Sequence, residues 1–133
     1  MASAETAGTD LLQRFIDTTL PAGDFHHEQH VQVAWRFVQQ YGMPAALAEF
    51  TAAIKRFADA KGATALYHET STWAFLLLIA ERQARSAPRT WEEFAAVHPD
   101  LLVWKPSILT RYYSKELLAS ELARRTFLMP DLI

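Results

Sequence analysis

Three of the five histidines in the chain fall within one pentapeptide, residues 26–30. If this segment is helical, His27 and His30 lie on one face, one turn apart, and His26 and His30 do so as well. Either pair could chelate one metal ion. We favour His27 with His30, because the apolar stripe of residues 31–38 extends backwards to both of them and turns them inward.

A second polar cluster, Tyr67-His68-Glu69-Thr70, stands where a later helix is expected to begin. The helix that starts at the first cluster and the helix after it are each about 16 residues long, so each spans roughly 24 Å. Short connections make successive helices antiparallel, which brings the chain back to the level of the first cluster. The sequence therefore predicts that His27, His30, His68 and Glu69 meet at one end of a bundle.

Two or three imidazoles and a carboxylate form a ligand set that suits zinc or non-haem iron. We therefore predict a small enzyme that holds one divalent metal, Zn or Fe, at this end of the bundle. The metal would activate water for a hydrolytic or lyase step, and iron would also allow oxygen chemistry. The predicted metal ligands are His27, His30, His68 and Glu69. Two of them, His68 and Glu69, are also predicted to be catalytic, and the predicted substrate-binding residues are Tyr67, Thr72 and Trp73.

Three alternatives to a metal-dependent enzyme stay open. Both clusters lie at expected helix N-termini, where the helix dipole disfavours a cation and keeps histidine neutral. The first is a metal-free enzyme in which His68 or His27 acts as general base and Glu69 orients it. The second is a non-enzymatic protein that binds a small molecule among its aromatic side chains. The third is a polar cluster that only stabilises the two helix starts.

A third polar segment, residues 104–113, combines aromatic rings with hydrogen-bond donors. Its Lys105 and Arg111 could hold a carboxylate or phosphate of the substrate, and Tyr112 could act as a catalytic acid. In small bundles such tyrosines more often pack their rings and leave the hydroxyl in water. His98 stands directly before a proline, so we expect it to mark a helix end and assign it no function.

The composition narrows the classes of function. A net charge of −2 lacks the basic excess of most nucleic-acid-binding proteins, so we expect no nucleic-acid partner. The absence of cysteine excludes disulfides, thiolate metal ligands and cysteine nucleophiles, and it fits a cytoplasmic protein. The most apolar run, residues 73–80, is far shorter than the ~20 residues of a membrane-spanning helix, so no membrane partner is expected. Residues 1–9 lack the pattern of a signal peptide and are expected to form a frayed tail.

The patterning predicts a single all-α domain over residues 1–133, a compact bundle of about five to six helices. The second to fourth helices are expected to form an up-down-up core. The expected helical segments are 10–19, 25–41, 44–61, 68–84, 90–98 and 114–125, with a further turn at 106–112. The apolar tail, residues 127–133, would lie across the bundle or pair with a second copy in a homodimer.

Four motifs resemble those of a family of small bacterial all-helical proteins with no established activity. They are Phe25-x-His27-x-x-His30, Tyr67-His68-Glu69-Thr70-x-Thr72-Trp73-x-Phe75, Trp104-x-Pro106-Ser107-x-Leu109-x-x-Tyr112-Tyr113 and Glu121-Leu122-Ala123-Arg124. Together they cover most of the chain after residue 24. The resemblance implies that these segments belong to one fold, and it implies no mechanism.

Overall fold

The computed structural model describes residues 4–132. Within this range the chain forms seven α-helices: α1 (Ala4–Ile16), α2 (His27–Tyr41), α3 (Ala45–Ala60), α4 (Glu69–Ser86), α5 (Trp91–Val97), α6 (Lys115–Leu118) and α7 (Glu121–Arg125). Four 3₁₀ helices connect them, at Ala22–Asp24, Thr64–Leu66, Pro99–Leu102 and Ile108–Arg111. The described part of the chain contains no strand, only an isolated bridge between Trp104 and Ser107, and the predicted all-α class is confirmed.

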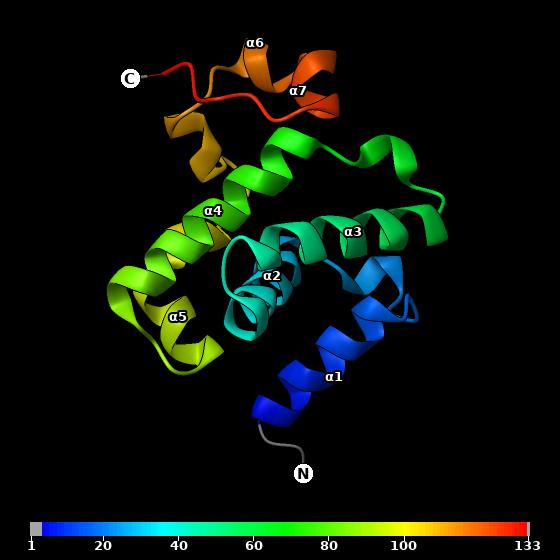
Figure 1. Cartoon of the computed structure of the whole chain (residues 1–133), viewed down its shortest axis with the longest axis vertical. Coiled ribbons are helices and arrows are strands. Elements are labelled where there is room, and N and C mark those ends of the chain that lie inside the picture. The colour runs from blue at the N-terminus through cyan, green and yellow to red at the C-terminus, as the bar shows by residue number, and fades with distance from the viewer. Residues whose placement is uncertain (1–3, 133) are drawn as a thin grey trace.

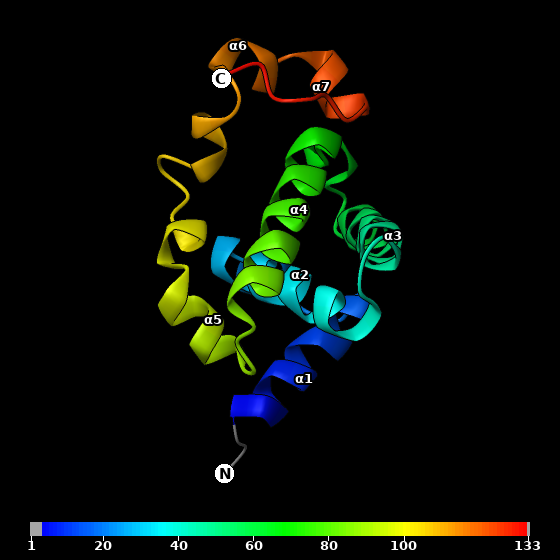
Figure 2. The ribbon, with the colours of Figure 1, turned by 60° about the vertical axis from the view of Figure 1, so that its left-hand side comes forward.

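Helix α2 forms the centre of the fold and packs against α1, α3 and α4. In Figure 1, α3 runs from the middle of the molecule to the right of the view, and α4 runs from the upper middle to the lower left. The turned view in Figure 2 shows α2 between α1 and α4. Most of the apolar residues expected to pack in these helices are buried, among them Phe50 and Phe57 of α3 and Leu76 of α4, whereas Tyr41 and Leu77 are exposed. The core surrounds α2 and also includes Phe15 of α1, Phe94 of α5 and Leu101 of the 3₁₀ helix that follows.

The helix ends follow local signals in the sequence. Gly42 and Gly62 follow α2 and α3 with a left-handed φ of 67°, which glycine adopts without a steric cost. Thr90 caps α5, because its hydroxyl accepts a hydrogen bond from the amide of Glu93 at 3.1 Å. The Glu93 carboxylate bonds the amide of Arg89 at 2.8 Å, one residue before the cap.

The first helix differs from its prediction at both ends. The expected tail covers residues 1–9, but α1 begins at Ala4, and residues 1–3 lie outside the described residues. The helix also ends at Ile16 instead of residue 19. Thr18 takes a left-handed φ of 64°, and the Leu20 amide bonds back to the Arg14 carbonyl at 3.0 Å, which closes the helix early.

The C-terminal third also differs, because the predicted helix over 114–125 is broken into α6 and α7. Each of the two has its own cap: Ser114 accepts from the Leu117 amide, and Ser120 accepts from the Ala123 amide, both at 3.1 Å. The second serine therefore starts a new helix where the apolar pattern alone indicated continuation.

The apolar C-terminal segment folds back onto its own chain. The hydroxyl of Thr70 in α4 donates to the Thr126 carbonyl at 2.7 Å and accepts from the Leu128 amide at 3.1 Å. Phe127 stacks on Trp73 with ring centroids 5.1 Å apart. The start of α4 is therefore one attachment point of this segment, and residues 112–114 form a second, where the Tyr113 hydroxyl donates to the Leu128 carbonyl at 2.8 Å. Within the described residues, no helix has both the length and the apolar character that crossing a bilayer requires.

Candidate functional site

A cavity of about 570 Å³ lies between α2, α3 and α4, and it is the feature of the fold best suited to hold a ligand. Its walls are mostly aromatic and aliphatic, including Phe50 and Phe57 from α3 and Phe75 from α4. Both predicted polar clusters contribute to its lining, through His27 and His30 of α2 and through residues at the start of α4. The chain folds back as predicted, so segments distant in sequence share one cavity.

His30 is a partly buried polar side chain in the wall of this cavity. It lies in the first turn of α2, with the Phe25 ring 4.7 Å and the Phe50 ring 6.0 Å from its own, centroid to centroid. No described residue forms a hydrogen bond with the imidazole. Burial, with a smaller effect from neighbouring His27, lowers its pKa from 6.5 to about 4. His30 is therefore neutral at pH 7 and presents one N–H donor and one free lone pair to the cavity.

His27 has one ring nitrogen bonded and one free. Its Nε2 lies 2.9 Å from the carbonyl oxygen of Leu101, and because a carbonyl only accepts, Nε2 carries the proton. In the neutral ring Nδ1 then keeps its lone pair. The ring packs against Phe75 and Trp104, both with centroids 5.0 Å away. Burial lowers the pKa of His27 below its usual value, while the bond to Leu101 opposes this effect.

His68 lines the same cavity, but both of its nitrogens are bonded to the protein backbone. As the N-cap of α4 it accepts at Nδ1 from the Ser71 amide, 3.0 Å away. Nε2 therefore carries the proton and donates to the carbonyl oxygen of Leu118 at 2.8 Å. In this arrangement His68 offers no free lone pair to a metal or to a substrate proton, and it joins the start of α4 to α6.

Glu69 does not line the cavity, although it was predicted as a ligand there. Its Oε1 accepts a hydrogen bond from the hydroxyl of Tyr67 and lies 3.9 Å from Nζ of Lys55. The lysine also lies over the Tyr67 ring, 5.1 Å from the centroid. Burial, then the contact with Glu69, raises the pKa of Tyr67, so its hydroxyl stays protonated. Tyr67 itself lines the cavity with its ring.

The structure therefore gathers three of the four predicted metal ligands around one cavity and turns the carboxylate toward Lys55. Within the described part of the chain, no three His, Asp or Glu side chains lie close enough together to hold a metal ion. The zinc or iron site stays a prediction: of its predicted histidine ligands, His27 Nδ1 and the ring of His30 keep a free nitrogen, and His26 also lines the cavity.

The predicted substrate-binding residues divide into two groups. Tyr67 and Thr72 line the cavity, whereas Trp73 packs on the C-terminal segment, and its buried Nε1 has no hydrogen-bond partner. Lys105, Arg111 and Tyr112 lie away from the cavity, and only Trp104 of the third polar segment reaches it. Phe25, Phe57 and Phe75 also line the cavity, a role that the sequence did not predict. An apolar stripe at helical spacing looks the same whether it faces a core or a cavity.

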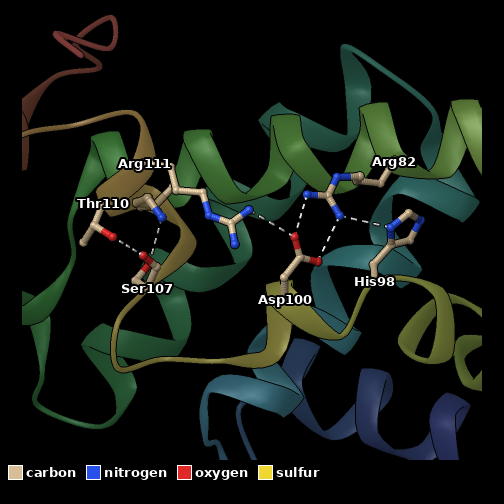
Figure 3. Close-up of polar contacts among 7 residues, drawn as sticks. Arg82, His98, Asp100, Ser107, Thr110 and Arg111 are labelled. Carbon is tan, nitrogen blue, oxygen red and sulfur yellow. Dashed lines mark hydrogen bonds and ion pairs between the residues drawn. The ribbon is translucent and has the colours of Figure 1, made fainter. Parts of the chain in front are cut away.

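The prediction that His98 has no role missed a polar network, shown in Figure 3. Arg82 of α4 binds Asp100 through two hydrogen bonds of 3.0 and 2.9 Å, and its Nη1 also donates to Nδ1 of His98 at 3.0 Å. Nε2 of His98 lies 2.9 Å from Oγ of Ser86. Arg111, predicted to bind substrate, lies 3.6 Å from Oδ2 of Asp100. Burial, then the charge of Arg82, lowers the pKa of His98. This network ties α4 to residues 98–111.

The geometry of the cavity is thus the basis for any functional assignment. Comparison with protein-family models, curated proteins and solved structures finds no match to this chain. The resemblance noted in the sequence motifs stays a prediction.

Proposed function

We propose that this protein binds one small organic molecule in the cavity between α2, α3 and α4. The molecule is mostly apolar, and it carries an uncharged polar group that hydrogen-bonds to His30. The observation that carries the proposal is the neutral, enclosed imidazole of His30, which has no protein partner and opens onto an apolar cavity.

The position of His30 supports this interpretation. His30 is partly buried, and its ring nitrogens are not among the fully buried atoms that lack a partner, so the imidazole stays accessible from the cavity. A buried polar group normally finds a hydrogen-bond partner, and here the protein leaves that place open to whatever occupies the cavity. A ligand hydroxyl, carbonyl or ring nitrogen would meet the donor or the acceptor of the imidazole, as water would in the empty cavity.

The dimensions and walls of the cavity support a ligand of modest size. Cavities that hold drug-sized molecules commonly measure about 300–1,000 Å³, and the cavity of about 570 Å³ falls inside this range. The rings of Phe50, Phe57 and Phe75 offer flat apolar faces to an aromatic or aliphatic body.

Binding without turnover fits the titrating groups better than general-base catalysis. His30 has a pKa of about 4, well below the value that suits a base at neutral pH. Both nitrogens of His68 are committed to backbone groups, and Glu69 bonds Tyr67 outside the cavity. Of the predicted catalytic bases, only His27 keeps a free lone pair, on Nδ1, in a ring that is held in place by its hydrogen bond to the Leu101 carbonyl.

The proposal is tested with N-phenyl-1-naphthylamine, an uncharged aromatic amine whose fluorescence rises in apolar surroundings. We expect it to bind the wild-type protein and to bind Ala58→Phe at least tenfold more weakly, because Ala58 lines the cavity and a phenyl ring would fill part of it. Ala48→Phe is the matched control, since Ala48 is exposed on the same helix outside the cavity. Equal binding to both variants, or no binding to the wild type, would refute the proposal.

A second candidate, a metal-dependent enzyme, draws support from His27 alone. Ligating histidines commonly donate their other N–H to a backbone carbonyl, as His27 does to Leu101. Elemental analysis of protein purified without a histidine tag tests this candidate. Stoichiometric zinc or iron that disappears in the double variant His27→Ala, His30→Ala would favour it over metal-free binding.

A further inference from the structure

Among the residues that the structure describes, Lys61 is the one lysine or arginine that lines the cavity. It follows α3 directly, and its Nζ donates to the carbonyl oxygen of Thr18 at 3.0 Å. The same ammonium lies 5.4 Å from the centroid of Phe57, a residue of the cavity wall. These two contacts place the charge beside the apolar wall and leave N–H donors of the ammonium for a ligand.

No negative charge balances Lys61 at this cavity. Of the Asp, Glu, Lys and Arg residues that the structure describes, Lys61 alone belongs to the lining, and no described acid forms an ion pair with it. The nearby carboxylates bond elsewhere: Asp17 accepts from the Thr19 hydroxyl at 2.6 Å, and Asp59 accepts from the Thr64 hydroxyl at 2.7 Å. Glu69, as described above, bonds Tyr67.

The surrounding backbone adds to this positive field. Helices α2 and α4 both begin at the cavity, since His27 is the first residue of α2 and His68 is the N-cap of α4. The N-terminus of a helix carries a partial positive charge, which favours anions and disfavours cations. The lysine and the two helix starts therefore both favour a negatively charged ligand over a cation.

We propose that the ligand is a monocarboxylic acid with an apolar body. Its carboxylate pairs with the ammonium of Lys61 at the rim, and its body runs inward between Phe50, Phe57 and Phe75 and brings its uncharged polar group to the imidazole of His30. A single ammonium balances the single charge of a carboxylate, whereas a phosphate group carries about −1.5 to −2 charge and three strong acceptor oxygens. This inference rests on the proposed binding function and adds the chemical class of the ligand.

The experiment compares three ligands that share one apolar chain: decanoate, 1-decanol and decylammonium. Each is titrated against the complex with N-phenyl-1-naphthylamine, and displacement gives its affinity. For the wild-type protein we expect decanoate to bind most tightly and decylammonium most weakly. Lys61→Met should weaken decanoate about tenfold, the usual worth of a charge-assisted hydrogen bond, and leave 1-decanol unchanged. Lys61→Arg should keep the preference for decanoate.

Arg56→Met is the matched control, because it removes the same charge from an exposed position of α3 outside the cavity. We expect it to bind decanoate as the wild type does. Equal affinity of the wild type for decanoate and 1-decanol would overturn the carboxylate assignment, as would equal losses in Lys61→Met and Arg56→Met. In both cases displacement by 1-decanol would still uphold the cavity as a binding site, whereas failure of the fluorescent amine to bind would remove the proposed function itself.

Discussion

Replacing His30 by leucine tests whether the protein maintains a neutral imidazole in its cavity. The variant removes an enclosed polar group without a protein partner and adds apolar contact with Phe25 and Phe50. At pH 7 we expect the free energy of unfolding of the ligand-free protein to rise by up to about 1 kcal/mol, because leucine adds buried apolar area beside Phe25 and Phe50 in place of a partly buried imidazole. Most core substitutions destabilise, so a gain here would be specific evidence of a functional position.

The pH dependence of this variant gives a sharper magnitude. His30 has a pKa of about 4 in the folded protein against 6.5 for the model imidazole, so the unfolded chain binds more protons between these values. Wild-type stability therefore falls as pH decreases from about 6.5 to 4. At 1.36 kcal/mol per pKa unit, this residue accounts for a loss of about 3 kcal/mol across that window. His30→Leu cannot lose it, so the advantage of the variant over the wild type grows by about that amount.

Urea denaturation at several pH values between 7.5 and 4.5 measures both effects. Gln39→Leu is the matched control, because it introduces a leucine at an exposed position of α2 outside the cavity and removes no titratable group. The control is expected to follow the wild-type pH dependence. The reasoning would be refuted if His30→Leu followed the same slope as the wild type, since His30 would then not be buried in its neutral form.

Three further substitutions test the contacts that hold the fold around the cavity, each by urea denaturation. Thr70→Val should cost about 2 kcal/mol, because it leaves the Thr126 carbonyl and the Leu128 amide without their partner, while Thr110→Val, at an exposed threonine, should cost less than half as much. Arg82→Met should cost about 1–3 kcal/mol by leaving Asp100 and His98 without their donor, and an unchanged unfolding midpoint would contradict the role of this network. Ser120→Ala should cost about 1 kcal/mol through loss of the α7 cap, with Ser120→Asp, which keeps a capping oxygen, close to wild type.

The arrangement of helices around the cavity could be predicted because it depends on local sequence signals, namely the spacing of apolar residues and the glycines that end helices. The stripe that includes Phe50 and Phe57 fixes the buried face of α3, and Gly42 and Gly62 set the ends of α2 and α3. Helix length alone then brings His27 and His68 to one cavity. These features depend on spacing and on backbone conformation, both of which are visible in a single sequence.

The detailed roles of the side chains could not be predicted, because they depend on partners distant in sequence. Nothing near His68 indicates that its Nε2 meets the carbonyl of Leu118, which commits a ring that looks free for chemistry. The direction of Glu69 is likewise decided by Tyr67 and Lys55. The network of His98 with Arg82 and Asp100 escaped for the same reason.

A crystal structure of the protein with N-phenyl-1-naphthylamine tests the central claim most directly. The account predicts that the amine lies between α2, α3 and α4, with its N–H within hydrogen-bond distance of a nitrogen of His30. Electron density for the amine only on the outer surface, or a cavity closed by the side chains that now line it, would contradict the account.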